Sequence, residues 1–272
     1  MQGVLKVAGA IGLVGGVFSY SFVGKNKYTN RYQLIIVPEW AENFLGQIAK
    51  NGFVSIKRVN VDSPVFESIE KITSSLLTEI NINKTWNLTI LDSDSVNAFV
   101  LPDGSIYVFT GLIHKFDNID EIAFVLSHEL SHVLLRHGSE KLSIQGVIEF
   151  LYFLIRIYIT GSMDFSGLGN LLVTLPLSRR AELEADFEAT EIMRKQGFNL
   201  LGALSLLEKL GESEEKNEIW SSHPVSEHRI NEIKELLKTN PQSESTLRDY
   251  SEMQKAFISA KSVLKTRDLA GK

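Results

Sequence analysis

Three of the six histidines in this sequence fall within ten residues, and two of them belong to one short pattern. The segment His128-Glu129-Leu130-Ser131-His132 has the form H-E-x-x-H. Residues four apart share one face of a helix, so His128 and His132 can each give a nitrogen to one zinc ion. Glu129 is too close to the first ligand to bind the same ion, and its carboxylate can take a proton from water on the metal. The pattern therefore predicts a hydrolytic zinc site.

A catalytic zinc needs a third protein ligand as well as an open position. A histidine six residues after the second one would be one solution, but Gly138 stands there and His137 comes one residue too early. We expect His137 to cap the C-terminus of the metal helix, where a cation or a donor is favoured. The third ligand must then come from elsewhere in the chain.

A charged segment from Ser178 to Lys195 offers that ligand. Glu182 and Asp186 are four residues apart, and the small Ala185 and Ala189 allow another helix to approach closely. We expect Glu182 to bind zinc and Asp186 to accept a hydrogen bond from the far nitrogen of a ligand histidine, which fixes its tautomer. The alternative is a solvated acidic face, the interpretation that we adopt for the remaining acidic residues of the segment, Glu184, Glu188 and Glu191.

Composition narrows the class of protein. The chain has 272 residues, 44% of them hydrophobic, which suits one globular domain with a core, with or without short appendages. A net charge of -5 gives no electrostatic reason to expect a nucleic-acid partner. Cysteine is absent, so disulfides and thiolate metal sites are excluded and a metal must bind imidazole, carboxylate or backbone oxygen.

Apolar periodicity predicts the helices that position these residues. The metal helix is expected from Asp120 to His137, with Gly138 as its stop. Ser63-Pro64 begins a helix that runs to Ile80. Further helices are expected at 178–195, at 200–210 and after Pro224.

Strands are expected in the first half of the chain. Tyr32 to Val37 and Trp86 to Leu91 are short apolar runs. The segments 97–101 and 105–110 read as two strands joined by the turn Pro102-Asp103-Gly104. Together with the helices, these strands predict an α+β fold that is mainly helical.

Two apolar segments raise the question of a membrane. Val4 to Val23 has nearly the length that spans a bilayer, and Lys25, Lys27 and Arg31 follow it. A cleaved signal peptide or a Gly-rich buried helix are the alternatives, but no A-x-A-like cleavage site stands out, which favours an uncleaved anchor. The segment 145–160 is apolar but contains charged residues, so it reads as a buried helix or as a segment that dips into a membrane.

These motifs resemble the gluzincin family that includes the prenyl-protein endopeptidases and the bacterial heat-shock membrane peptidases. The resemblance rests on the metal motif with Ser178-Arg179, Glu182 and Glu184-Ala185-Asp186, and on two further segments, Asn97 to Leu112 and Ser222-His223-Pro224 with Arg229-Ile230. It covers roughly 31–237. Asn30 to Leu34, the apolar stretch after the metal helix and the Trp220 to Pro224 spacing are similar to the mitochondrial inner-membrane quality-control subgroup, whose activity overlaps that of the m-AAA protease.

The resemblance implies roles for individual residues. Zinc would bind His128, His132 and Glu182, one ion per subunit, with Glu129 as the general base. His223 would stabilise the oxyanion and Arg229 would orient that region; the alternative for His223 is a surface residue before proline. Extended substrates would pair with the strand at Asn97, Ala98 and Phe99 by strand addition, although this segment can also be read as an ordinary hairpin.

It also implies a fold, a domain order and partners. The expected fold is a zincin-like metallopeptidase domain with a small sheet at 31–240, preceded by a membrane anchor and linker at 1–30 and followed by a helical tail at 241–272. The implied partners are a membrane and unfolded or membrane proteins as substrates, and self-association into homo-oligomers stays open. The mitochondrial inner membrane is the expected location, and the bacterial cell envelope is the alternative. An inactive membrane-bound binding module is a third hypothesis, against which Glu129 argues because a structural zinc site does not need it.

Overall fold

A computed structural model describes residues 23–26, 29–37, 43, 46, 50, 55–78, 80, 84–145, 177–212 and 223–270. The chain divides into two compact units. One comprises Met1–Glu42 with Leu135–Leu175, and the other comprises Asn43–Leu134 with Pro176–Lys272. The larger unit holds all the residues for which a chemical role is expected.

A three-stranded sheet forms one layer of the larger unit. Strand β3 (Asn87–Leu91) pairs in parallel with β5 (Ser105–Phe109), and β4 (Ala98–Val100) pairs antiparallel with β5. The strand order β3-β5-β4 leaves β4 at an edge. The β4–β5 turn needs glycine, because Gly104 has a φ of 90° and a Cβ atom there would lie 2.4 Å from the Thr85 carbonyl oxygen. The predicted hairpin and its turn are therefore confirmed.

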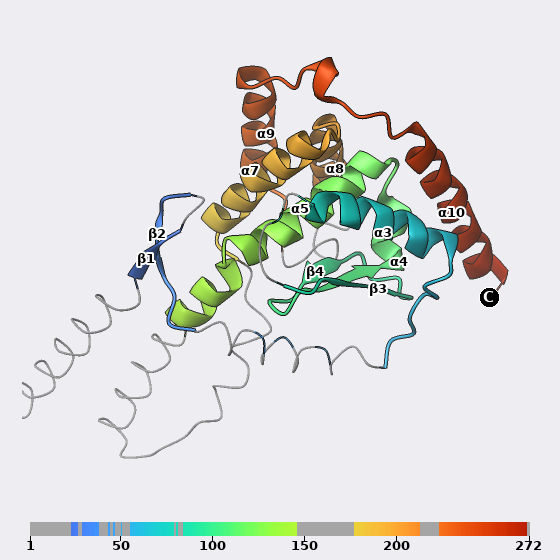
Figure 1. Ribbon diagram of the computed structural model, residues 1–272, viewed down its shortest axis with the longest axis horizontal. Helices are drawn as coiled ribbons and strands as arrows, with labels where there is room; N and C mark the ends of the chain where they lie inside the picture. Colours follow the sequence, from blue (N-terminus) through green and yellow to red (C-terminus); the bar gives the residue numbers. More distant parts are fainter. Residues whose placement is uncertain are drawn as a thin grey trace, which may run out of the picture. The chain divides into compact units, whose positions relative to one another are not determined.

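Helices cover this sheet, with α3 and α5 over it in Figure 1. Apolar side chains from the sheet and helices form the main core, in which Ile106, Val108, Ile69 and Leu126 are almost fully buried. Leu91, Tyr107 and Phe109 of the sheet form a second, smaller cluster. The helices in chain order are α3 (Pro64–Leu77), α4 (Thr110–Lys115), α5 (Ile119–Leu134), α7 (Arg179–Gln196), α8 (Leu201–Glu212), α9 (Glu227–Thr239) and α10 (Ser251–Ala270), with a 3-10 turn, η2, at Glu244–Thr246. The mainly helical fold with a small sheet is as the sequence predicts.

Local signals explain where several of these helices begin. Ser63, Ser178 and Ser226 accept hydrogen bonds from backbone N–H groups in the first turns of α3, α7 and α9. Helix α7 ends at Gly197, which has a φ of 75° as expected of a left-handed cap. The starts of α3 and α7 thus lie within one residue of the predicted positions.

The end of α5 differs from the prediction. The helix stops at Leu134, Arg136 adopts a φ of 55°, and a further helical segment spans 137–145. His137 is buried within that following segment and does not cap α5, and Gly138 is not its stop. The physical reason is that Leu135 directs its carbonyl oxygen to the side chains of Asn26 and Gln33, more than 100 residues earlier, instead of continuing the helix.

The smaller unit contains an antiparallel pair, β1 (Val23–Lys25) and β2 (Tyr32–Leu34). Arg31 binds Glu140 through two nitrogens at 2.5 and 2.6 Å, and Gln33 donates to the same carboxylate at 2.9 Å. Ser143 accepts a hydrogen bond from the Ile36 N–H at 2.8 Å. Arg31, Gln33 and Ile36 are therefore bound to the helical segment 137–145.

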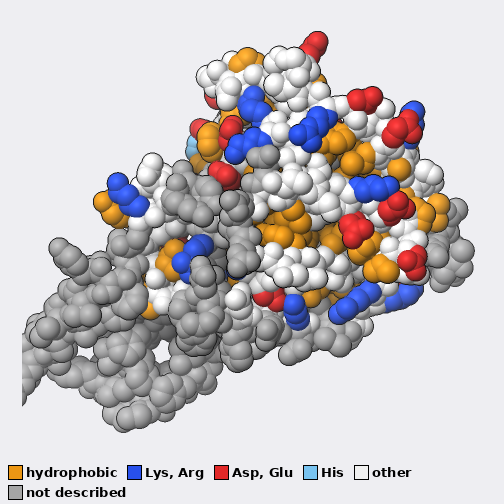
Figure 2. All heavy atoms as spheres, viewed as in Figure 1, with side chains coloured by type: hydrophobic (Ala, Val, Ile, Leu, Met, Phe, Trp, Pro, Cys, Tyr) orange, Lys and Arg blue, Asp and Glu red, His pale blue; other side chains and the backbone are white. Residues whose placement is uncertain are grey.

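Within the described ranges, no helix combines the length and the apolar character needed to cross a membrane. The predicted anchor at 4–23 falls, apart from Val23, outside the described residues, as does the apolar segment from 146 to 160. On the face drawn in Figure 2, acidic, basic and apolar side chains are interspersed over the described surface.

Candidate metal centre

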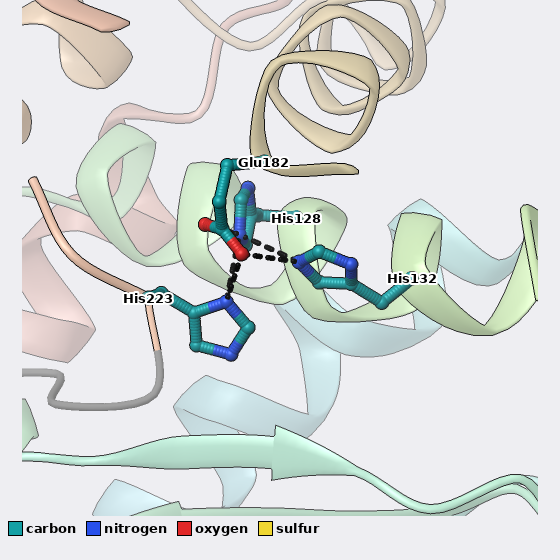
Figure 3. A group of neighbouring side chains, drawn as sticks. All are labelled: His128, His132, Glu182 and His223. Atoms are coloured by element: carbon teal, nitrogen blue, oxygen red, sulfur yellow. Dashed lines mark hydrogen bonds and ion pairs between the residues drawn. The ribbon is translucent and has the colours of Figure 1, made fainter. Parts of the chain in front are cut away.

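Four side chains from three segments converge in the interior of the larger unit (Figure 3). His128 and His132 come from α5, Glu182 comes from the first turn of α7, and His223 lies just before α9. The Nε2 atoms of His128 and His132 are 2.9 Å apart. Glu182 places Oε2 3.4 Å from Nε2 of His128 and Oε1 3.6 Å from Nε2 of His132. The three predicted ligands are therefore brought together.

These distances suit atoms that share one metal ion. Ligand atoms bound tetrahedrally at about 2.0–2.1 Å lie about 3.3 Å from one another. The three separations between these ligand atoms fall on either side of that value. Two imidazoles and a carboxylate are also a donor set used by catalytic zinc sites. The buried cluster thus fits a metal ion.

Small residues let the two ligand-bearing helices approach each other. Ala185 and Ala189 of α7 are fully buried, and α5 and α7 form the most extensive helix contact of the larger unit. All α5 residues except Asp120 and Val133 are buried. Helix α5 is therefore a central helix surrounded by other elements, which explains its apolar character on more than one face.

Asp186 holds the far side of the His128 ring. Its Oδ1 atom lies 2.9 Å from Nδ1 of His128, while Nε2 of that ring faces the cluster. Arg229 binds the same carboxylate with two nitrogens, each at 2.7 Å. Burial alone would raise the pKa of Asp186, but Arg229 and His128 lower it below its usual value. A charged carboxylate at this position keeps Nδ1 of His128 protonated and Nε2 free to bind metal.

Arg229 connects several parts of the site. Its Nη1 atom lies 3.0 Å from Oε2 of Glu182 and donates to the carbonyl oxygens of His223 and Pro224 at 3.3 and 3.2 Å. The side chain is only 2% exposed. One buried guanidinium thus holds Glu182, Asp186 and the backbone that carries His223.

His223 lies inside the cluster. Its Nδ1 atom is 3.0 Å from Oε1 of Glu182 and 3.4 Å from Nε2 of His128, and its Nε2 atom is 3.3 Å from Oε1 of Glu129. With 5% exposure, it is not a surface residue before a proline, so that alternative is wrong. The ring adjoins both the expected ligands and the expected general base.

Glu129 is 4% exposed and belongs to the same helix turn as both histidines. The other acidic residues of α7 lie outside the cluster: Glu184 pairs with Arg180 at 3.1 Å, and Glu191 lies 3.6 Å from Arg194. Carboxylates with an expected role and carboxylates without one are therefore separated in space.

The expected substrate strand is the edge strand β4. Ala98 is 1% exposed and points into the core, whereas Phe99 stacks on Tyr107 with ring centroids 5.0 Å apart. Asn97 accepts the Phe109 N–H with its carbonyl oxygen at 3.1 Å and the Ala98 N–H with its side chain at 2.9 Å. The side chains of these residues are engaged within the fold, so an added strand would meet the backbone edge of β4.

Comparison with known proteins supplies the family. The model of peptidase family M48 matches residues 64–237, more than half of the chain and all of the cluster just described. The chain belongs to peptidase family M48. This M48 chain therefore carries its metal motif, its third acidic residue and its late His-Pro segment within the matched region.

Relatives of this M48 chain come from mitochondria and from bacteria. It is 34% identical to the mitochondrial metalloendopeptidase OMA1 of Schizosaccharomyces pombe over 56% of this chain and 47% of that protein. It is 31% identical to the Saccharomyces cerevisiae OMA1 over 83% of this chain and 72% of that protein. The metalloprotease LoiP of Escherichia coli is 30% identical over 59% of this chain and 66% of that protein. The chain thus spans about half the length of the fission-yeast relative that it matches.

Sequence reasoning missed residues that hold the start of α5. Glu121 is fully buried and accepts two hydrogen bonds from Lys209, at 2.8 and 2.9 Å. The Asn118 side chain accepts the Glu121 N–H, and Glu121 accepts the Asp117 N–H, which is a variant of the capping box. The Asn-x-x-Glu spacing could have indicated this start, whereas nothing in the local sequence points to Lys209.

Proposed function

We propose that this M48 chain is a zinc-dependent endopeptidase. The observation that carries the proposal is the convergence of His128, His132 and Glu182 at distances suited to one ion, with Glu129 buried beside them. Zinc is the favoured metal because two imidazoles and one carboxylate leave a fourth position open for chemistry.

The residues around the metal would divide the work of peptide hydrolysis. When bound, zinc supplies a water of lowered pKa and polarises the scissile carbonyl. Glu129 would take the proton from the attacking water and pass it to the leaving amine. His223 would donate a hydrogen bond to the oxygen of the tetrahedral intermediate, and its closeness to Glu129 supports that role. Asp186 and Arg229 would orient His128 and the His223 segment.

The substrate would bind as an extended strand along β4. The edge position of β4 supports this proposal, because its outer side has no partner strand among the described residues. Backbone hydrogen bonds at Asn97, Ala98 and Phe99 would then give affinity with a loose sequence preference. Unfolded or membrane proteins are the substrates that suit such a site.

We infer a membrane setting in mitochondria, as part of inner-membrane quality control. The names of the OMA1 relatives and the apolar stretch at 4–23 support it. The similarity to LoiP supports the alternative, a bacterial envelope enzyme. We retain the domain order of anchor and linker (1–30), metallopeptidase domain (31–240) and helical tail (241–272), with homo-oligomers left open.

The test compares detergent-solubilised wild type with the Glu129→Gln variant on an unfolded model protein such as casein, with bound zinc quantified in both. We expect zinc in both proteins and cleavage only by the wild type. Equal cleavage by both proteins would overturn the role of Glu129. Zinc without cleavage in either would favour the binding-module hypothesis and contradict the proposed function.

A further inference from the structure

Side chains from two later helices form hydrogen bonds with the short linker between α4 and α5. The carbonyl oxygens of Lys115, Phe116 and Asp117 follow one another in sequence. They accept hydrogen bonds from Lys209 of α8, from Lys261 of α10 and from Gln254 of α10, respectively. Cationic donors are favoured at the Lys115 and Phe116 oxygens because these two carbonyl groups lie at the C-terminal end of α4.

Gln254 also binds the first residue of the metal helix. Its Oε1 atom accepts the Ile119 N–H at 2.8 Å. The first N–H groups of a helix have no partner within the helix, so this side chain satisfies a group that α5 cannot satisfy itself. A single glutamine thus contacts backbone on both sides of the point where α5 begins.

Helix α10 is itself firmly anchored. It packs against α3, and Phe257 and Ala260 are buried in the core. The family match ends at 237, so α10 lies beyond the matched residues. The contacts that α10 makes with the linker therefore come from outside the part of the chain that the family model covers.

A cleft of about 340 Å³ opens beside this junction, lined by residues that include Ile119, Asp120, Tyr250 and Gln254. Water can therefore reach the Ile119 N–H if Gln254 is removed, and the free energy lost from folding would be small. Removal of Gln254 would change the placement of α5 more than the stability of the protein. The reason is that a water molecule in place of this side chain does not fix α5 against α10.

We propose that Gln254 is a positioning residue that sets the placement of α5, and through it His128 and His132, relative to Glu182 on α7. Helix α5 is continuous from Ile119 to Leu134, so a shift at its first turn moves both histidines together. Glu182 belongs to a separate helix and does not follow that shift. A misplacement of about 1 Å in an active site can cost about 100-fold in rate. The inference rests on the proposed function for its activity readout.

The test uses three full-length variants loaded with metal. Gln254→Met removes the contacts to Ile119 and Asp117, and Gln254→Glu keeps the acceptor for the Ile119 N–H but loses the donor to the Asp117 carbonyl. Lys255→Met introduces the same side chain at an exposed neighbour. We expect Gln254→Met to lower kcat about three- to tenfold at a temperature well below its Tm. The KM and the zinc content should stay near wild type in all three variants. The kcat of Lys255→Met should be unchanged, and that of Gln254→Glu, which keeps one of the two contacts, should lie between the wild type and Gln254→Met.

A second readout separates this inference from the proposed function. The visible spectrum of the Co²⁺-loaded protein reports the ligand geometry without turnover. We expect the largest change of spectrum for Gln254→Met and none for Lys255→Met. If the wild type binds zinc and cleaves nothing, the proposed function fails, and the cobalt spectra still decide the positioning role. Equal spectra and an equal kcat for Gln254→Met and Lys255→Met would overturn it, even if Gln254→Met lowers the Tm.

Discussion

Nδ1 of His128 lies 2.9 Å from Oδ1 of Asp186, on the side of the ring opposite the metal cluster. The carboxylate fixes the tautomer in which Nε2 of His128 is free to bind metal. Replacing it with an amide removes the negative charge and weakens this preference. We expect Asp186→Asn to lower the zinc affinity about 10- to 100-fold. Competition with a chelator of known affinity measures the change.

The matched control for this experiment is Glu188→Gln, on the same helix and outside the cluster. It makes the same change of charge two residues away and should leave the zinc affinity at the wild-type value. An equal loss of affinity in both variants would show that the charge of α7, and not the contact with His128, controls metal binding.

Removal of Arg229 should destabilise the metal-free protein strongly. The substitution Arg229→Met leaves Glu182 and Asp186 buried without their shared cation, and breaking a buried ion pair in this way costs about 3–5 kcal/mol. The double variant Arg229→Met/Asp186→Asn should recover part of that loss, because the buried negative charge is then removed. Urea unfolding of the wild type, the two single variants and the double variant tests this coupling, and simple additivity of the two single effects would contradict it.

The contact between Arg229 and Asp186 also predicts how the stability of the protein depends on pH. Burial would raise the pKa of Asp186, but Arg229 and His128 lower it, so its stabilising contribution is present above the unfolded-state pKa and is lost as pH falls. In Arg229→Lys, which keeps a charge and loses the two-nitrogen contact, the folded-state pKa should rise. The loss of stability on acidification, which begins near the unfolded-state pKa in both proteins, should therefore be smaller in Arg229→Lys and complete at a higher pH, as unfolding of the metal-free proteins against pH will show.

A buried hydroxyl next to the metal motif should be dispensable. Oγ of Ser127 is buried and has no hydrogen-bond partner among the described residues, whereas Oγ of Ser131 donates to the Ser127 carbonyl at 2.6 Å. An unsatisfied buried polar group costs about 1–3 kcal/mol. We expect Ser127→Ala to stabilise the protein by about 1 kcal/mol and Ser131→Ala to destabilise it by a similar amount. Urea midpoints give both values, and a loss of stability in Ser127→Ala would contradict the prediction.

Gly111 should be required for the loop that leads into β4. A Cβ atom there would lie 2.2 Å from the Asp94 carbonyl oxygen, so Gly111→Ala must displace that loop. We expect a loss of about 1–3 kcal/mol in stability and a raised KM for an extended peptide, with zinc binding retained. Gly138→Ala is the control, because a Cβ atom at Gly138 meets nothing within 4 Å. A KM unchanged in Gly111→Ala would argue against strand addition at β4.

The site could be predicted from sequence where its geometry is local. His128 and His132 share a face through helix periodicity alone, and Ser178 with Gly197 bounds the helix that carries Glu182. The position of His223 within the cluster depends on contacts with residues 41 and 95 positions away, which no local pattern encodes. The same holds for Gln254, whose partner Ile119 is 135 residues distant.

The prediction of where α5 ends was wrong for a related reason. Apolar periodicity and Gly138 favoured continuation to His137, but the chain turns at Leu135 and Arg136 because donors from residues 26 and 33 are available there. Helix propensity is a weak preference, and a tertiary contact of this kind overrides it.

The contacts between residues 26–36 and the segment after α5 bear on where the polypeptide can be shortened for laboratory work. A version that starts at residue 38 would retain Glu140 and the Leu135 carbonyl but lose Arg31, Gln33 and Asn26, which bind them. Two polar groups that are now satisfied would then need water. A fragment that starts at Val23 keeps every one of these donors and is the better choice for crystallisation.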